Sequence, residues 1–386
     1  MTADPILKLV RPDILAMLGY EPIEPAELIA ERLGIAPERI AKLDGNENPF
    51  GPSPRVIEAL ASFESYHRYP DPQQRKLRAA LGEYAGVPPE HIVAGHGSDE
   101  IIDLLLRAVL DRGDVVIDCP PTFGMYSFSA AVCGGTLAQA PRRDDFTLDI
   151  DAVRALAPGA KVIFVASPNN PTGNPLARNE LDALLDTELL VVVDEAYVEF
   201  AGSGEQSEPF SGRREGQDNR PGSATESHAT LVPQRENLVV LRTFSKWAGL
   251  AGLRAGYGIM PQALARVLMH IKPPYTPNVA ADVAMLASLE ARDELMADVK
   301  AIVKERDRMS RMLAALEPLQ VYPSSANFVL ARAPERSGRE LRDGLARRGL
   351  FVRYFDTPRL QDCLRISVGL PDETDRVVDA LREELT

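Results

Sequence analysis

One lysine stands directly after an apolar, strand-like run and among hydroxyl groups and glycines. This residue is Lys246, in the segment TFSKWAGLAGLR at 243–254, which follows the run LVVLR at 238–242. A lysine amine becomes a nucleophile when a desolvated pocket and cationic neighbours remove its proton, and it then forms a Schiff base with a carbonyl group. We therefore predict that Lys246 is the nucleophile of an active site. The ordinary alternative is a surface lysine on a glycine-rich loop.

The same segment carries groups that suit a phosphate. Thr243 and Ser245 place hydroxyls on either side of the lysine, and Arg254 follows it by eight residues. Eight residues are about two helical turns, so a helix would return Arg254 to the face of Lys246. Its planar fork of donors can bind a phosphate there. We predict a phosphate site around these residues.

A second pattern for binding anions lies at 95–100, where the sequence is GHGSDE. A glycine-rich turn that leads into a helix presents unpaired N–H groups and the positive end of the helix dipole. Ser98 and Asp99 are the residues at this turn that could contact a phosphate. An ordinary capped helix is the competing interpretation.

Three further runs have the composition of buried strands, at 115–118, 162–166 and 189–193. Sheets of the α/β class bind ligands at the carboxyl ends of their strands. The first run leads to Phe123, which could stack on a flat ring or pack in the core. The second leads into a tight polar turn, and the third ends at Asp194, a natural partner for a protonated ring nitrogen.

Length and composition are those of a globular protein with one large domain and a smaller companion. The chain has 386 residues, 45% of them hydrophobic and 26% charged, and a formal net charge of −13. The acidic balance argues against a nucleic-acid surface. No basic N-terminal region precedes an apolar core, and no run approaches roughly 18 apolar residues, so we expect no membrane span and a cytoplasmic protein. Three cysteines without a CxxC or His/Cys cluster indicate neither disulfides nor a metal site.

The order of the helix and strand patterns predicts three regions. Residues 1–45 form an N-terminal arm that belongs with the small domain, residues 46–272 form a large domain, and residues 273–386 form the small C-terminal domain. Within the large domain, residues 201–233 are rich in Gly, Ser, Glu, Arg and Pro and poor in apolar residues. Such a stretch buries too little surface to order itself, so we expect a disordered insertion.

Several motifs, in this order and spacing, resemble those of the fold-type I aminotransferases that depend on pyridoxal 5'-phosphate (PLP), and most closely the histidinol-phosphate aminotransferases. The motifs are LDGNENPFGPSP, RYPDP, GHGSDE, PPTFGMY, SPNNPTG, DEAYVEF, TFSK, GLAGLRAGY and CLRISVG. The resemblance extends over nearly the whole chain except 201–233. The resemblance implies an α/β fold with a mostly parallel seven-stranded sheet in the large domain, a smaller α+β domain, and a homodimer.

The resemblance also implies a role for each matching residue around PLP. Lys246 would form the Schiff base, and Asp194 would keep the pyridine nitrogen protonated. Tyr197 and Asn170 would hydrogen-bond the ring hydroxyl, and Phe123 would stack on the ring. The phosphate would be held by Ser98, Asp99, Thr243, Ser245 and Arg254, with Tyr69 from the other subunit.

The implied substrates are histidinol phosphate and glutamate or its partner 2-oxoglutarate. Histidinol phosphate has no α-carboxylate, so one site must hold either a carboxylate or a phosphate dianion, and a phosphate needs additional donors. The residues that the resemblance assigns to substrate binding are Tyr20, Asn46, Arg353 and Arg365.

Three other functions are compatible with much of this motif set. A general or aromatic aminotransferase would keep the PLP residues and Arg365 but would not need Arg353 and Tyr20 for a phosphate. A lyase similar to L-threonine-O-3-phosphate decarboxylase would bind a phosphate and release CO2. A PLP-binding regulator usually carries a DNA-binding helix-turn-helix, for which this chain has no room before Asn46. We expect histidinol phosphate to be the substrate. The geometry of the pocket decides which of these substrates is accepted.

Overall fold

The computed structural model describes residues 4–19, 22–201, 227–334 and 336–385. The strands are β1 Ala41–Leu43, β2 Ile92–His96, β3 Val115–Asp118, β4 Thr136–Gln139, β5 Val162–Ala166, β6 Leu190–Asp194, β7 Leu238–Thr243, β8 Ala255–Ile259, β9 Gln320–Val321, β10 Phe328–Arg332, β11 Leu350–Tyr354 and β12 Cys363–Ser367.

The α-helices are α1 Pro12–Ala16, α2 Ala26–Leu33, α3 Pro54–Ser62, α4 Arg75–Ala85, α5 Gly97–Val109, α6 Met125–Val132, α7 Ile150–Leu156, α8 Arg178–Leu185, α9 Val198–Ala201, α10 Gln262–Ile271, α11 Val279–Glu290, α12 Arg292–Ala314, α13 Gly338–Arg347 and α14 Pro371–Leu385. The 3-10 helices are η1 Pro5–Leu9, η2 Pro37–Arg39, η3 Pro89–His91, η4 Ala157–Gly159, η5 Ala229–Gln234 and η6 Ala251–Leu253.

Seven strands form the large sheet, in the order β2-β8-β7-β6-β5-β3-β4. Strands β7, β6, β5, β3 and β4 are parallel to their neighbours in this series, and β8 is antiparallel to both β7 and β2. The predicted α/β class and the mostly parallel seven-stranded sheet are thus confirmed. The parallel strands end at one edge of the sheet, which is where ligands bind in such folds.

Each face of the large sheet has its own hydrophobic core, because alternate residues of a strand point to opposite faces. On β5, Ile163 and Val165 belong to the core cluster that also contains buried residues of α4, α8 and α11. Val162 and Phe164 belong to the other cluster, with residues of α5, α6 and α10. A sheet covered on both faces explains why these strands are continuous apolar runs.

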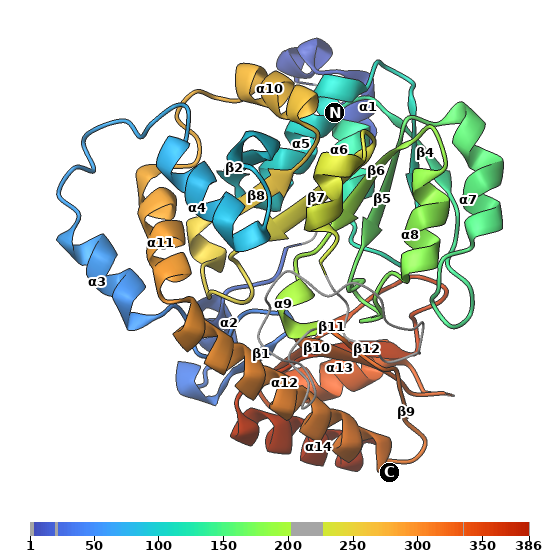
Figure 1. Cartoon of the computed structure of the whole chain (residues 1–386). Coiled ribbons are helices and arrows are strands. Elements are labelled where there is room, and N and C mark those ends of the chain that lie inside the picture. The colour runs from blue at the N-terminus through green and yellow to red at the C-terminus, as the bar shows by residue number, and fades with distance from the viewer. Residues whose placement is uncertain (1–3, 20–21, 202–226, 335, 386) are drawn as a thin grey trace.

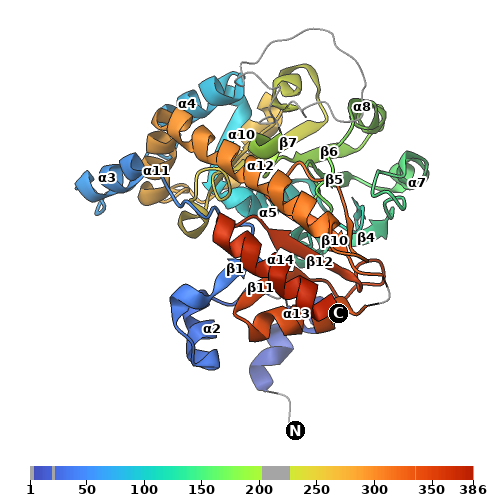
Figure 2. The ribbon, with the colours of Figure 1, turned by 90° about the horizontal axis from the view of Figure 1, so that it is seen from below.

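The second sheet has five strands in the order β1-β11-β12-β10-β9. Strand β1, from the N-terminal part of the chain, pairs in parallel with β11, and the other strand pairs are antiparallel. This sheet lies below the large one in Figure 1, and Figure 2 shows α12, α13 and α14 packed over its lower face. The N-terminal strand therefore belongs to the small sheet, while the proposed limits of the domains remain a prediction.

One local expectation is corrected. The predicted insertion 201–233 lies outside the described residues between 202 and 226, but its C-terminal end forms η5, with Ala229 and Val232 in the main core. That end was wrongly assigned because the apolar residues of 229–232 are too few to outweigh the polar composition of the whole stretch. In the described part of the chain, no helix has the length and apolarity to cross a membrane.

Candidate active site

The candidate active site lies where the carboxyl ends of the parallel strands face the five-stranded sheet. Lys246 follows β7, and its Nζ donates to the carbonyl of Gly45, two residues after β1, at 3.0 Å. Asn170 follows β5, and its Oδ1 accepts from Nη1 of Arg365 on β12 at 2.7 Å. Residues from distant parts of the chain therefore meet between the two sheets.

The amine of Lys246 is electrostatically prepared for chemistry. Burial lowers its pKa from 10.5 to about 8, and the positive charge of Arg365 acts in the same direction. Arg254 also lowers this pKa, whereas Glu47 and Asp99 raise it. A lysine with a pKa near 8 has a substantial unprotonated fraction near neutral pH, as a nucleophile or proton acceptor requires.

Asp194, the last residue of β6, is buried and held in one orientation. Its Oδ1 accepts the N–H of Ala196 at 3.1 Å, and its Oδ2 accepts the hydroxyl of Tyr126 at 2.8 Å. Burial raises the pKa of Asp194 to about 6, and the Tyr126 hydrogen bond opposes that rise. Both groups that hydrogen-bond this carboxylate are neutral, so it is suited to a cationic partner such as a protonated ring nitrogen.

Tyr126 is a site residue that sequence reasoning did not assign. It lies on α6, is buried, stacks on Phe164 at 5.0 Å between ring centroids, and contacts the edge of Phe123 at 5.5 Å. The one signal in the sequence was its place in PPTFGMY, a few residues after a strand exit. Nothing in that motif indicates that the Tyr126 hydroxyl reaches Asp194.

Tyr197 is buried at the centre of a group of amides. Its hydroxyl oxygen accepts from Nδ2 of Asn46 at 3.0 Å and lies 3.5 Å from Nδ2 of Asn170. Its ring contacts Phe328 of β10 edge to face at 5.2 Å. The structure thus brings Tyr197 and Asn170 together, as the prediction that they share one ligand atom requires.

The predicted phosphate donors surround the start of α5. Gly97 has φ 77°, Ser98 and Asp99 lie in the first turn, and Asp99 pairs with Arg254 at 2.8 Å. A Cβ on Gly256 of β8 would lie 2.6 Å from the Ser98 nitrogen, so glycine lets this strand approach the helix terminus.

The hydroxyls of Thr243 and Ser245 are 2.9 Å apart. Arg254 lies near the start of α5, where it pairs with Asp99. The prediction that a helix would place it on the face of Lys246 was wrong. No α-helix joins it to Lys246; Arg254 ends η6 with φ 52°.

Arg365 and Arg353 lie opposite each other in the small sheet. They are register partners on β12 and β11. Arg365 is buried, and its guanidinium contacts the faces of Phe328 and Phe355 at 5.4 and 5.7 Å. Arg353 also contacts the ring of Phe355, at 5.8 Å. The two guanidinium groups therefore share one aromatic ring, and the charge of Arg365 lowers the pKa of Lys246.

Some predicted residues are not gathered in the site. Tyr20 lies outside the described residues. Tyr69 is 78% exposed and stacks on Tyr275 at 4.1 Å, so its predicted role toward the other subunit remains a prediction. Phe123 borders Tyr126, and its stacking on a ring is likewise untested.

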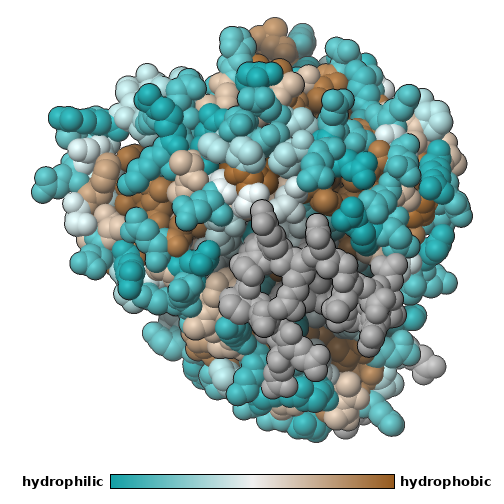
Figure 3. All heavy atoms as spheres, in the orientation of Figure 1, coloured by the Kyte–Doolittle hydropathy of each residue, from teal (hydrophilic) through white to brown (hydrophobic). Residues whose placement is uncertain are grey.

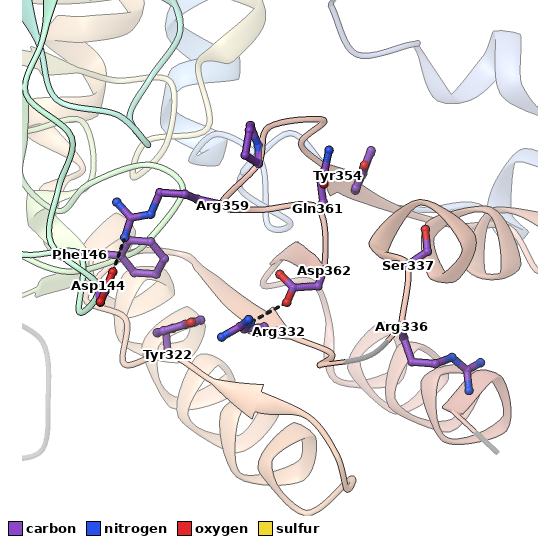
Figure 4. A pocket seen from close by; sticks show the side chains of 11 residues that line it. Asp144, Phe146, Tyr322, Arg332, Arg336, Ser337, Tyr354, Arg359, Gln361 and Asp362 are labelled. Atoms are coloured by element: carbon purple, nitrogen blue, oxygen red, sulfur yellow. Dashed lines mark hydrogen bonds and ion pairs between the residues drawn. The ribbon is translucent and has the colours of Figure 1, made fainter.

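A separate cavity of about 720 Å3 lies between the loop after β4 and residues of the small sheet and its loops (Figure 4). It is lined by Asp144, Phe146, Tyr322, Arg332, Arg336, Ser337, Tyr354, Pro358, Arg359, Gln361 and Asp362. Its arginines already donate to the protein: Arg332 to Asp362, Arg359 to the backbone of Arg142 and Arg143, and Arg336 to the backbone near the C-terminus. Lys246 and Asp194 are not among its walls, so we do not assign the chemistry to this cavity.

The residues present fit PLP, the cofactor that the resemblance implies. A helix N-terminus, two hydroxyls and a guanidinium suit its phosphate. Among the described residues, the side chain of the buried Asp194 is hydrogen-bonded by the two neutral donors given above, and it suits the ring nitrogen. A lysine with a lowered pKa suits its aldehyde.

The match of residues 38–381 to the family described as aminotransferase class I and II defines the class of protein. The chain belongs to this family. It is 50% identical to the histidinol-phosphate aminotransferase of Roseiflexus castenholzii over 388 residues, 98% of each chain. It is 43% identical to the chloroplastic histidinol-phosphate aminotransferase of Nicotiana tabacum, over 97% of this chain and 86% of that one. The structure of histidinol-phosphate aminotransferase from Sinorhizobium meliloti in complex with pyridoxal-5'-phosphate has a TM-score of 0.84 at 27% identity, with 97% of both chains covered.

Proposed function

We propose that this aminotransferase uses PLP to transfer an amino group between L-histidinol phosphate and 2-oxoglutarate, a step of histidine biosynthesis. The observation that carries the substrate assignment is the pair Arg353 and Arg365, which are register partners beside the site. The 50% identity to a histidinol-phosphate aminotransferase over 98% of both chains supports it. When bound, PLP supplies an electron sink for the negative charge that develops on the substrate carbon.

Each residue of the site has its own role toward that cofactor. Lys246 takes the proton from the substrate Cα as a general base, for which its lowered pKa is suited. Asp194 holds a positive charge on the ring nitrogen. Tyr197 and Asn170 orient the ring hydroxyl, and the donors at the start of α5 and around Thr243 fix the phosphate.

The two arginines distinguish this function from its alternatives. Arg365 binds the carboxylate of glutamate or the phosphate of histidinol phosphate, because both substrates present an anion at the same place. Arg353 adds donors that only the phosphate dianion needs. A general or aromatic aminotransferase has no use for this second cation. A phosphothreonine decarboxylase-like lyase would use it but would need no amino acceptor.

The two half-reactions provide the test. In Arg353→Ala, losing one charge-assisted contact from a dianion should cost about 1.5–3 kcal/mol, or roughly 10- to 150-fold in kcat/KM with histidinol phosphate. The half-reaction with glutamate should change much less, because Arg365 remains. Arg365→Ala is the matched variant and should weaken both half-reactions.

Stopped-flow absorbance of each half-reaction measures these losses. Equal losses for both substrates in Arg353→Ala would contradict the phosphate assignment and favour a general or aromatic aminotransferase. Release of CO2 from L-threonine-O-3-phosphate without an amino acceptor would favour the lyase.

We also propose that the enzyme is a homodimer whose sites combine both subunits. Hydrophobic residues, brown in Figure 3, gather on the face near α3, α4 and α11. The exposed large side chains of α3 and of the segments next to α4 and α11 are Ile57 at 54%, Tyr66 at 49%, Tyr69 at 78% and Tyr275 at 43% exposed. Exposed apolar surface of this kind marks interaction sites. A second copy that covers this face would bring its Tyr69 toward the cofactor phosphate.

Hybrid dimers test this proposal. Mixing Tyr69→Phe protomers with Lys246→Ala protomers should create one site that carries neither change, so activity should rise above that of either variant alone. Sedimentation of the wild type should give the mass of two chains. Activity that never exceeds that of the separate variants would contradict shared sites. The expected cytoplasmic location remains a prediction, which cell fractionation would check.

A further inference from the structure

Three consecutive residues after β1 hold three functional side chains. The carbonyl of Asp44 accepts from the Arg365 guanidinium, and the carbonyl of Gly45 accepts from Lys246 Nζ at 3.0 Å. Nδ2 of Asn46 then donates to the Tyr197 hydroxyl at 3.0 Å. We call residues 44–46 the junction segment. It contacts the large-sheet residues Lys246 and Tyr197 and the small-sheet residue Arg365 at once.

Within this segment, Asn46 is held in place by hydrogen bonds to its backbone and to its side chain. Its side chain and backbone are fully buried, and its φ of 52° is a left-handed conformation that asparagine tolerates better than most residues. Ser367 accepts its N–H at 2.9 Å and donates to its Oδ1 at 2.8 Å. Asn327 donates to its carbonyl at 3.0 Å. The amide oxygen of Asn46 is thus engaged by protein and its amide nitrogen by Tyr197.

The strand that carries Arg365 also carries the support of Asn46. Arg365 and Ser367 are two residues apart on β12, so their side chains lie on one face of the sheet. The face that presents the cation to a substrate anion therefore also fixes the amide that contacts Tyr197.

We infer that Asn46 is a positioning residue for the Tyr197 phenol rather than a substrate ligand. The inference rests on the proposed function, in which Tyr197 donates to the ring oxygen of PLP. A hydroxyl oxygen that accepts an amide hydrogen becomes a stronger donor through its own O–H, because successive hydrogen bonds polarise one another. Asn46 strengthens that donation and keeps the phenol aimed at the cofactor. A substrate ligand would act only when substrate is present, whereas a positioning residue acts on the resting holoenzyme.

Asn46→Asp tests this assignment with little change of shape. The new carboxylate keeps an acceptor for Ser367 but turns the Tyr197 proton away from the ring oxygen. The ring oxygen of PLP loses its stabilising donor and holds negative charge less well. The neighbouring nitrogen of Lys246, when joined to PLP, therefore keeps its proton to higher pH. The readout is the pH midpoint of the visible absorption change of the PLP-loaded protein without substrate. We expect the midpoint to rise by about one pH unit, the size of a typical environmental shift.

Two further variants separate positioning from added charge. Asn48→Asp introduces the same charge two residues away, where Nδ2 donates to the Trp247 carbonyl, and it should move the midpoint much less. Ser367→Ala adds no charge and removes the support of Asn46, so it should raise the midpoint by a smaller amount. The charged groups that act most on Lys246, namely Arg365, Glu47, Arg254 and Asp99, are unchanged in all three variants.

The outcomes are distinct from those for the function itself. A wild-type protein that gives no visible band with PLP would overturn the proposed function. A wild-type band whose midpoint is the same in Asn46→Asp and Ser367→Ala would overturn the inference alone. Equal shifts in Asn46→Asp and Asn48→Asp, with none in Ser367→Ala, would also overturn it, since charge would then explain the effect. If Asn46→Asp does not fold, Ser367→Ala alone decides.

Discussion

The large and small sheets build the site by different means. The large sheet contributes side chains that directly follow strand ends, such as Asp194 at the end of β6 and Lys246 after β7. The small sheet contributes Arg365, and beside β1 the junction segment contributes backbone carbonyls to Arg365 and Lys246. Side chains at strand ends can be located from a motif. Backbone acceptors brought in by a distant segment cannot, because any residue type has a carbonyl.

This difference suggests a division of labour. In the proposed function, groups on the large sheet would hold the cofactor and move protons, so changing them should affect both half-reactions. In the proposed function, groups on the small sheet would bind substrate anions: changing Arg353 should separate one substrate from the other, whereas changing Arg365 should weaken both half-reactions. Within the large sheet, buried charges that do not face the site should affect only stability.

The largest effect is expected from Lys246→Ala. This change removes both the nucleophile and the general base, and general-base catalysis alone is worth about 10^2–10^4-fold. Both half-reactions should fall at least that far in single-turnover assays, and the visible absorption that PLP gives with the wild type should change. Lys272→Ala is the matched control, since Lys272 is also buried and its Nζ donates to the backbone carbonyls of Pro273, Pro274 and Thr276. Transamination retained at a wild-type rate in Lys246→Ala would refute the site.

Arg242→Met should have the next largest effect, on stability. Arg242 is buried on β7 between Glu195 at 3.3 Å and Glu199 at 2.6 Å. Removing the cation shared by two buried carboxylates should cost about 3–5 kcal/mol of unfolding free energy. The control Arg178→Met breaks an exposed pair with Asp182 and should cost about 0–1 kcal/mol. Urea denaturation of the apoprotein measures both, and equal losses would contradict a structural role for the buried cluster.

Much of the large sheet could be predicted from sequence because its strands are continuous apolar runs. The predicted strands 115–118 and 162–166 agree with β3 and β5 of the structure. Short elements such as β1 and β4 were not predicted, since three or four residues with mixed polarity carry no period. Strand β1 acquires its place only by pairing with β11, more than 300 residues later in the chain.

The candidate site divides in the same way. Lys246, Asp194 and Tyr197 stand in motifs whose chemistry follows from residue type and position. The Tyr126 contact depends on the rotation of α6 against β6, and the Asn46 contacts depend on Ser367 and Asn327, which are far away in sequence. Arg254 shows the converse case. It was predicted to lie near Lys246 because of a helical period. In the structure, Arg254 itself has a left-handed backbone conformation after η6 and pairs with Asp99.

Tyr126→Phe should have a moderate effect that is equal for both substrates. The change removes the hydroxyl that Asp194 accepts but keeps the ring that stacks on Phe164. Because the Tyr126 hydrogen bond lowers the Asp194 pKa, its loss should raise that pKa further and weaken the negative partner of the ring nitrogen. A lost hydrogen bond to a charged group is worth about 1.5–3 kcal/mol, so PLP affinity should fall roughly 10- to 150-fold.

Fluorescence titration with PLP measures that affinity. Tyr84→Phe is the matched control, because Tyr84 is also a tyrosine whose hydroxyl donates to a carboxylate, Glu199, at 3.1 Å, away from Asp194. A loss of PLP affinity as large in the control would mean that any buried hydroxyl matters equally. A loss confined to one substrate would contradict the division between the sheets.

The smallest expected effect links the two regions through charge. The Lys246 pKa is lowered to about 8, first by burial and next by Arg365 of the small sheet. The unprotonated amine reacts with PLP, so the rate of PLP incorporation into the apoprotein should rise with pH and level off above about pH 8. Arg365→Gln removes a cation that opposes protonation, so the midpoint should move to higher pH, toward 10.5. Arg353→Gln, whose charge is not among the main influences on Lys246, should move it less. Stopped-flow absorbance across pH 6–10 gives the three midpoints, and a downward shift in Arg365→Gln would mean that the small sheet does not tune the lysine of the large one.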